Sequence, residues 1–252
     1  MPKIPTKSAL ILLSGGQDST TCLAWALKRF KNLHAITFDY GQRHKIELKA
    51  AKKIAKIVGI PIKIQKIDLF HHLTKSALTH DQKITTGSKN QPPSTFVPGR
   101  NLIFLSTAAI YANQLGMNDL ITGVCQTDFS GYPDCRNEFI KSLEKTLKLA
   151  MNYHFKIHTP LMWLTKGQTV NLIKKHKKLE LLKHSHTCYE GMRPACAKCP
   201  ACKLRLKGFK EAKTVDNSLE ISAYFDSVVN DHKHHEKKHN SMCSPQVPFK
   251  NY

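Results

Sequence analysis

The chain contains the stretch Ser14-Gly15-Gly16-Gln17-Asp18-Ser19-Thr20 between an apolar run, Ala9–Leu13, and a segment with helical spacing of apolar residues, Ser19–Phe30. This order predicts a strand, a tight turn and a helix. Two adjacent glycines let the backbone turn sharply with its N–H groups facing inward, and the first helical turn adds unpaired N–H groups and the positive end of its dipole. The stretch is therefore predicted to bind a phosphate or pyrophosphate group.

The side chains of this stretch narrow the kind of nucleotide site. Hydroxyl groups at Ser14, Ser19 and Thr20 add donors around the anion. No Gly-Lys-Ser/Thr of a Walker A loop follows, and the glycines lack the spacing of dinucleotide-binding folds. The motif Ser-Gly-Gly-x-Asp-Ser instead resembles the pyrophosphate loop of the N-type ATP pyrophosphatases. That resemblance implies cleavage of ATP between its α and β phosphates; a glycine turn with ordinary helix capping is the alternative.

Length and cysteine usage limit the class of protein. A chain of 252 residues fits one α/β domain with an appendage. No apolar run approaches the roughly 20 residues that span a bilayer, and Met1–Pro5 lacks the apolar segment of a secretory signal. We therefore expect a cytoplasmic protein without a membrane partner. Its eight cysteines should then be reduced, so that clustered ones indicate metal binding or chemistry.

The formal net charge of +21 is compatible with a polyanionic partner such as tRNA. However, only six of the 39 basic residues are arginine, and the lysines are scattered through almost every segment. No basic stripe with interleaved aromatic residues is visible in the sequence. We therefore expect no stable nucleic-acid partner, and a small-molecule substrate instead.

Apolar runs alternate with helical patterns along the chain. The predicted strands are Ala9–Leu13, His34–Phe38, Ile62–Ile67, Leu120–Val124 and Lys156–Pro160. The strongest helical patterns are Ser19–Phe30, Ile46–Val58, Leu102–Leu115 and Phe139–Met151. This alternation predicts an α/β fold with a doubly wound, parallel, five-stranded sheet, in which ligands bind at the carboxyl ends of the strands.

Polar segments follow several of these strands or lead into the next helix. They are Asp39–His44, Pro98–Asn101, Gln126–Arg136 and Thr165–Gln168, the last being a predicted capping box. We expect all of them to surround one cleft. The segment from His71 to Phe96 is predicted to be a long loop that can act as a lid.

Four cysteines follow the pattern Cys-x7-Cys-x2-Cys-x2-Cys: Cys188, Cys196, Cys199 and Cys202. Four soft ligands at this spacing suit tetrahedral zinc, and because no coordination position stays open, the expected role is structural. An iron–sulfur cluster is the alternative. Cys125 and Cys135, which bracket another loop, are interpreted as small buried residues rather than catalytic thiols.

Five stretches, taken in order, resemble the 7-cyano-7-deazaguanine synthase family. They are Ser14–Thr21, Phe38–His44, Val97–Asn101, Asp128–Arg136 and the four-cysteine segment. The resemblance covers about residues 8 to 210. The glycine loop alone indicates only the superfamily, whereas the Ser-Gly-Tyr-Pro-Asp-Cys-Arg sequence and the cysteine spacing are specific for the family.

The resemblance implies an ATP-dependent ligase of queuosine biosynthesis, which converts 7-carboxy-7-deazaguanine and ammonia to 7-cyano-7-deazaguanine. Two adenylations in one site would take the acid to the amide and then to the nitrile. The implied cofactors are ATP, Mg²⁺ and one structural Zn²⁺ per chain, and the implied assembly is a homodimer. The expected domains are an ATP pyrophosphatase domain (1–180), a zinc-binding helical lobe (181–225) and a basic His-rich tail (226–252).

The resemblance also implies roles for individual residues of the nucleotide site. The nucleotide-binding segment comprises Leu13, Ser14, Gly15, Gly16, Gln17, Asp18, Ser19, Thr20, Thr21, Cys22 and Leu23. Asp18 is expected to help bind Mg²⁺. Arg100 and Lys166 are expected to neutralise phosphates or the substrate carboxylate.

Other residues are candidates for contacts with the substrate itself. Asp128 or Asp134 is expected to accept hydrogen bonds from the N–H groups of a guanine-like ring, with Tyr132 or Phe129 stacking on its face. Arg43 or Arg136 is expected to bind the carboxylate. For each residue, a surface salt bridge or loop-stabilising contact is the alternative.

Two other functions compete with this interpretation. One is a tRNA-modifying enzyme of the lysidine synthetase or thiolase type, which would adenylate a base in tRNA. The net charge favours it, but no appended RNA-binding domain is evident. The other is a zinc-ribbon module that binds nucleic acid and carries an inactive glycine loop.

Overall fold

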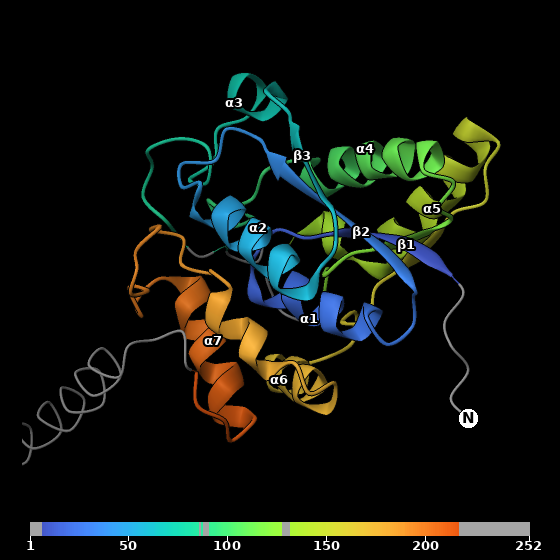
Figure 1. Cartoon of the computed structure of the whole chain (residues 1–252). Coiled ribbons are helices and arrows are strands. Elements are labelled where there is room, and N and C mark those ends of the chain that lie inside the picture. Colours follow the sequence, from blue (N-terminus) through green and yellow to red (C-terminus); the bar gives the residue numbers. More distant parts are fainter. Residues whose placement is uncertain (1–6, 86, 88–90, 128–131, 217–252) are drawn as a thin grey trace, which may run out of the picture. The chain divides into compact units, whose positions relative to one another are not determined.

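A parallel sheet of five strands, in the order β3-β2-β1-β4-β5, forms the centre of the structure (Figure 1). The strands are β1 (Ser8–Leu12), β2 (Asn32–Asp39), β3 (Ile62–Lys66), β4 (Asp119–Ile121) and β5 (Lys156–His158). The computed structural model describes residues 7–85, 87, 91–127 and 132–216, which belong to one compact unit. The predicted doubly wound α/β class is confirmed, and β4 and β5 are shorter than the apolar runs that predicted them.

Successive residues of the central strand pack on opposite faces of the sheet. The helices that cover these faces are α1 (Gln17–Ala26), α2 (Ile46–Val58), α4 (Arg100–Gln114) and α5 (Asn137–Met151). Leu10 of β1 lies in the core beneath α4 and α5, whereas Ile11 lies in the core beneath α1 and α2. Because strand side chains alternate and both faces are covered, every position of the strand is apolar apart from Ser8 at its start.

Two further helices and a short 3₁₀ segment pack against α1. They are α6 (Lys166–Lys175), α7 (Pro200–Glu211) and η2 (Leu179–His184). They share a buried apolar cluster with α1 that includes Ala24, Ile173, Leu182 and Phe209. A Cβ at Gly208 of α7 would lie 2.9 Å from Lys166 Cβ, so glycine allows the two helices to approach closely. This shared core crosses the expected boundary between residues 180 and 181.

The helix α6 begins where the predicted capping box placed its start. The Thr165 side chain accepts a hydrogen bond from the Gln168 backbone, and the Gln168 side chain accepts one from the Thr165 backbone. The predicted capping box is therefore confirmed. It fixes the first residue of α6, Lys166, at the edge of the sheet where the strands end.

The expected loop at residues 71–96 begins inside a short helix, α3 (Leu69–Leu73). Its other described residues form turns that fold back on one another, since Ala77 N donates to the Ser94 carbonyl over 2.8 Å. The His-rich tail lies outside the described residues. Among the helices that the structure describes, none combines the length and the apolar character needed to cross a bilayer.

The winding of the sheet reverses between β1 and β4, and this point determines where a ligand can bind. β1 leads into Ser14–Gly16, and β4 leads into Thr122 and Gly123. A Cβ at Gly123 would lie 3.0 Å from Ser19 N, so glycine lets the end of β4 approach the start of α1. The two strand ends thereby form the floor of one site.

Candidate active site

The glycine loop connects β1 to α1 and presses against α2. Gly15 has a φ of +89°, and a Cβ there would lie 2.3 Å from the Glu47 carbonyl oxygen. Only glycine fits this position. Gly16 caps α1 without a side-chain hydrogen bond, so the first N–H groups of the helix are left for an anion. The Ser14 and Ser19 hydroxyl groups lie 3.0 Å apart beside them.

Asp18 and Lys166 form an ion pair directly after this loop. Lys166 Nζ lies 2.7 Å from Asp18 Oδ2, and the two residues lie in the first turns of α6 and α1, which are distant in the sequence. The other oxygen, Asp18 Oδ1, is buried and has no hydrogen-bond partner among the described residues. A carboxylate oxygen in this position is a ligand that Mg²⁺ prefers. The pair therefore offers both a cation ligand and a cationic side chain to phosphate groups.

Arg100, the first residue of α4, also lines the cavity that holds this pair. Its guanidinium carbon is 6.0 Å from the centre of the Tyr132 ring. Burial lowers the pKa of Arg100, but the neighbouring Tyr40, Tyr132, Asp134 and Cys135 together raise it by more, so that the pKa lies above its ordinary value. Arg100 is therefore a permanent positive charge in the wall.

The helix start around Arg100 is fixed by a loop residue. Asp134 Oδ2 accepts a hydrogen bond of 3.0 Å from Asn101 N, and the Asp134 carbonyl accepts one of 3.2 Å from Asn101 Nδ2. Asp134 lies in the short 3₁₀ segment η1 (Pro133–Cys135). These bonds join the β4 loop to α4 and hold Tyr132 next to Arg100.

Glu47 adds a negative group to the same cavity from the first turn of α2. Burial raises the pKa of Glu47 to about 7, although the positive charge of Arg100 opposes that shift. Tyr40 and Tyr189 lie close enough for the charge of Glu47 to affect their pKa values, which burial raises above the ordinary value. The wall thus combines opposite charges with neutral phenol groups.

Asp18, Lys166, Arg100, Tyr132 and Glu47 line one cavity of about 320 Å³. Its walls come from the loop after β1, the starts of α2, α4 and α6, the segment after β4, and residues 186–189. A volume of this size is at the lower end of sites for small ligands.

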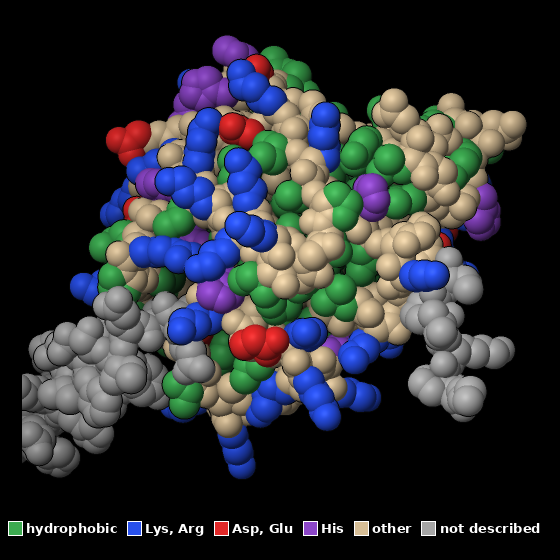
Figure 2. Space-filling model, viewed as in Figure 1, with side chains coloured by type: hydrophobic (Ala, Val, Ile, Leu, Met, Phe, Trp, Pro, Cys, Tyr) green, Lys and Arg blue, Asp and Glu red, His purple; other side chains and the backbone are tan. Residues whose placement is uncertain are grey.

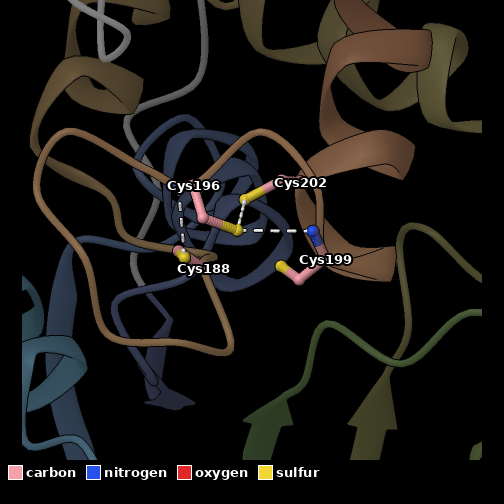
Figure 3. Close-up of side chains that lie close together, drawn as sticks. All are labelled: Cys188, Cys196, Cys199 and Cys202. Atoms are coloured by element: carbon pink, nitrogen blue, oxygen red, sulfur yellow. Dashed lines mark hydrogen bonds between the residues drawn. The ribbon is translucent and has the colours of Figure 1, made fainter. Parts of the chain in front are cut away.

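The four cysteines at residues 188–202 gather around one point, as Figure 3 shows. Their sulfur atoms all lie within 4.8 Å of one another, and Cys196 Sγ is 3.9 Å from Cys202 Sγ. Four sulfurs at about 2.3 Å from a tetrahedral zinc would be about 3.8 Å apart. Hydrogen bonds from Cys199 and Cys202 lower the pKa of Cys188, whereas the hydrogen bonds of Cys202 with Cys188 and Cys199 raise the pKa of Cys202. The cluster can bind a metal ion.

The cysteine lobe also forms part of the cavity wall. His186 N donates to the Gly15 carbonyl over 2.9 Å, and Cys188 and Tyr189 line the cavity. The buried Arg205 of α7 holds this segment by donating to Ser185 Oγ, over 2.8 Å, and by pairing with Asp216. The lobe and the phosphate loop therefore face each other directly.

Comparison with known proteins agrees with this geometry. Residues 8–213 match the family described as Queuosine biosynthesis protein QueC. The chain belongs to the QueC family. The QueC-family match is supported by three relatives named 7-cyano-7-deazaguanine synthase. That of Shouchella clausii is 53% identical and covers 79% of this chain and 92% of the relative. Those of Lysinibacillus sphaericus and Clostridium acetobutylicum are each 51% identical, covering 81% and 83% of this chain and 95% and 96% of the relatives.

In this QueC-family chain, the three expected catalytic residues Asp18, Arg100 and Lys166 line one cavity. Within the expected nucleotide-binding segment, the residues from Leu13 to Ser19 other than Gly15 also line it. Thr20 is fully buried and donates to the Gly16 carbonyl over 2.7 Å. The segment therefore divides into a ligand-facing part and a part that supports it from the core.

The expected substrate residues are less uniform in their placement. Tyr132 and Arg43 line the cavity, but Arg43 also pairs with Asp81 over 2.8 Å. Asp134 is buried and held by Asn101, and Arg136 is exposed and does not line the cavity. Asp128 and Phe129 lie outside the described residues. Their roles all stay predictions.

The thiols near the cavity have ordinary structural contacts. Burial, followed by the charge of Asp134, raises the pKa of Cys135 to about 12, so this thiol stays protonated at neutral pH. Cys125 Sγ donates to the Leu164 carbonyl over 3.3 Å. Both observations agree with the interpretation of these cysteines as packed residues rather than nucleophiles.

Sequence reasoning missed Glu47, Tyr189 and Arg205. One signal could have found Glu47: it falls on the same helical face as Ala50, Ala51 and Ile54, where an acidic residue is out of place. No comparable signal marks Arg205, because its partners, such as Ser185 and Asp216, stand at no regular spacing from it and are brought together only by the fold of the lobe.

Proposed function

We propose that this QueC-family chain is an ATP-dependent ligase that converts 7-carboxy-7-deazaguanine and ammonia to 7-cyano-7-deazaguanine. The names of the relatives support this assignment. The observation that carries it is the Asp18–Lys166 pair, which adjoins an anion-binding loop in a cavity that also holds Arg100. Such a cavity offers cationic groups for the phosphates of ATP and for a carboxylate at the same time.

The first half of the reaction makes the carboxylate reactive. A carboxylate oxygen attacks the α-phosphorus of ATP, pyrophosphate leaves, and an acyl-adenylate forms. Ammonia then forms the C–N bond, the C–O bond to AMP breaks with its electron pair going to AMP, and nitrogen loses a proton. The product of this half is the amide.

The second half removes the amide oxygen. This oxygen attacks the α-phosphorus of a second ATP molecule, and pyrophosphate leaves again. The C–O bond then breaks, AMP departs with the electron pair, and nitrogen loses its two protons as the nitrile forms. Because both halves attack the same phosphorus position, one phosphate loop serves both.

The residues at the loop would divide the work of holding the phosphates. The N–H groups at the start of α1, with Ser14 and Ser19, would bind the pyrophosphate portion. Asp18 would hold Mg²⁺ through its unpartnered oxygen, and the ion would reduce the repulsion between the phosphates and the attacking oxygen. Lys166 and Arg100 would neutralise the charge that remains.

The other wall would bind the substrate. Tyr132 is proposed to stack on the deazaguanine ring, and Asp128 or Asp134 to accept its N–H groups. Arg43 or Arg136 is proposed to bind the carboxylate. We further propose that the cysteine cluster holds one structural Zn²⁺ per chain, which is supported by the sulfur separations.

The proposed assembly is a homodimer. Support comes from exposed apolar side chains on the neighbouring helices α4 and α5, where Ile110 is 63% and Leu149 is 75% exposed. Light scattering after size exclusion should give twice the chain mass of 28.5 kDa.

The test of function is an incubation of the purified protein with ATP, Mg²⁺, ammonium and 7-carboxy-7-deazaguanine, without RNA. Mass spectrometry should detect the amide and then the nitrile, together with AMP and pyrophosphate. Pyrophosphate release that requires tRNA, or AMP release without a nitrile, would contradict the proposal.

A further inference from the structure

Among the described residues, Glu47 differs from the buried Asp134 and Asp216 in having no hydrogen-bond or ion-pair partner. The buried Asp134 is bonded to Asn101, and the buried Asp216 is paired with Arg205. In the part of the chain that the structure describes, the Glu47 carboxylate has neither a hydrogen bond nor an ion pair, although it is partly buried in the cavity wall. A carboxylate taken out of water without a partner is costly, so its presence indicates a group that serves a ligand.

The position of Glu47 joins it to the reaction centre. Its backbone carbonyl is the atom that a Cβ at Gly15 would strike at 2.3 Å, so Glu47 stands directly over the phosphate loop. Arg100 and Tyr40 are its neighbours from α4 and from the end of β2, and Tyr189 approaches from the cysteine lobe. These three groups interact electrostatically with Glu47, and Arg100 is the only cation among the three.

The proposed reaction needs a proton acceptor that the phosphate-binding residues do not provide. Lys166 and Arg100 are cations, and Asp18 is occupied by Lys166 and by its proposed role toward Mg²⁺. Yet nitrogen loses a proton when ammonia becomes an amide, and it loses two more when the amide becomes a nitrile. A base that faces the cavity from beside the loop meets this need.

We propose that Glu47 is a catalytic residue that accepts the proton released by nitrogen in the amide-forming step and again in the nitrile-forming step. This inference rests on the proposed function. In the first step the nitrogen lone pair forms the C–N bond, AMP leaves with the C–O electron pair, and the N–H electron pair returns to nitrogen as the proton passes to Glu47. In the second step nitrogen releases its two protons one after the other, and the two N–H electron pairs stay behind to complete the C≡N bond and the nitrogen lone pair. Glu47 passes each proton to solvent before it accepts the next.

The chemistry also predicts what Glu47 does not do. Adenylation of the carboxylate transfers no proton, so it needs the phosphate loop but no base. Replacement of Glu47 should therefore separate the two stages. A pKa near 7 suits this task, since a base with such a pKa is ionised enough to act and basic enough to accept a proton at neutral pH.

The experiment compares E47Q with wild type in two assays. Exchange of labelled pyrophosphate into ATP, with the acid but without ammonia, measures adenylation, and rapid quench with ammonia at constant free NH₃ measures amide formation. We expect E47Q to keep exchange within about twofold and to form amide about 100-fold more slowly. The wild-type rate should rise through pH 7 and level off, and E47Q should lack that rise.

Two variants control for structural effects. E47D keeps a carboxylate and should restore part of the amide-forming rate, which a merely structural role does not predict. E138Q makes the same substitution in the first turn of another helix, α5, at an exposed position, and should behave as wild type in both assays.

The outcomes separate this inference from the proposed function. Nitrile formation by wild type together with undiminished amide formation by E47Q would overturn the role of Glu47 alone. Loss of pyrophosphate exchange in E47Q would also overturn it, because it would assign Glu47 to adenylation. Absence of both amide and nitrile with wild type would overturn the proposed function and, with it, the proton transfer.

Discussion

The two walls of the cavity are built in different ways. The phosphate wall comes from six consecutive residues, Ser14–Ser19, and local contacts such as the 3.0 Å pair of serine hydroxyls shape it. The lobe wall comes from residues 185–205, and a cysteine cluster and the buried Arg205–Asp216 pair hold it. The loop wall is therefore shaped mainly by its own backbone, whereas the lobe wall depends on side-chain contacts that the fold brings together.

The sharpest test of the phosphate wall is Asp18→Ala. This variant removes the proposed Mg²⁺ ligand and the ion pair with Lys166, so pyrophosphate release should fall by about 10³-fold or more. Quantification of pyrophosphate checks the effect. Asp68→Ala, which breaks an exposed pair with Lys66, is the control and should retain activity. Near-normal turnover in Asp18→Ala would remove this residue from the mechanism.

The lobe wall should respond to loss of one cysteine. Cys199→Ser leaves three sulfur ligands, and the midpoint of thermal unfolding should fall by about 10 °C as the metal is lost. Elemental analysis and calorimetry measure the two effects, and Cys243→Ser is the control outside the described residues. Bound zinc near one per chain in Cys199→Ser would show that the cluster is not the metal site, and stoichiometric iron in wild type would favour the iron–sulfur alternative.

Gly15→Ala tests the contact between the loop and α2. The added Cβ would meet the Glu47 carbonyl at 2.3 Å on top of the strain of a positive φ, so the free energy of unfolding should fall by about 2 to 4 kcal/mol. Gly59→Ala is a matched control, since Gly59 also has a positive φ (+72°) but nothing within 4 Å of its Cβ position. It should cost about 1 kcal/mol. Chemical denaturation measures both variants. If Gly15→Ala and Gly59→Ala lost the same free energy of unfolding, the loop would be able to shift away from α2.

The smallest effect is a pH dependence of stability in Glu47→Gln. The folded-state pKa of Glu47 is about 7, above the ordinary 4.5, so the folded wild type binds more protons than the unfolded chain between these values. The free energy of unfolding of wild type should therefore fall relative to Glu47→Gln as pH rises from 4.5 to 7. Above pH 7 the variant should be more stable by about 1 to 2 kcal/mol, a partial effect because the carboxylate is only partly buried. A difference that is the same at pH 4 and pH 8 would contradict the raised pKa.

The fold and the phosphate wall could be predicted because their signals are local. Apolar runs alternating with helical patterns gave the strands of the sheet, and the capping box at Thr165 gave the start of α6 to the residue. The Ser14–Thr20 stretch contains its own turn, its own helix start and its own hydroxyls. The ends of strands are predicted less well than the strands themselves. β4 and β5 end at Ile121 and His158, before the ends of the runs that predicted them.

The opposite wall could not be predicted in the same way. The cysteine spacing indicated a metal site, but it did not indicate that His186 would bond to Gly15 or that Tyr189 would line the cavity. The ion-pair partner of Arg43 could not be predicted either, because Asp81 lies in a segment whose sequence has no helical or strand periodicity. Which of two similar residues faces a ligand depends on tertiary contacts that the spacing of residues does not encode.

The hydrogen bond from His186 to Gly15 joins the metal lobe to the nucleotide loop, and this has a thermodynamic consequence. Two binding events that share an ordered contact are linked reciprocally: the free energy that ATP gains from an ordered lobe is gained equally by the metal when ATP is bound. At equilibrium, a higher chelator concentration should therefore be needed to remove the proposed metal when nucleotide is present. If the chain binds both groups as proposed, abundant ATP in the cell would favour retention of the metal, and depletion of ATP would favour its loss.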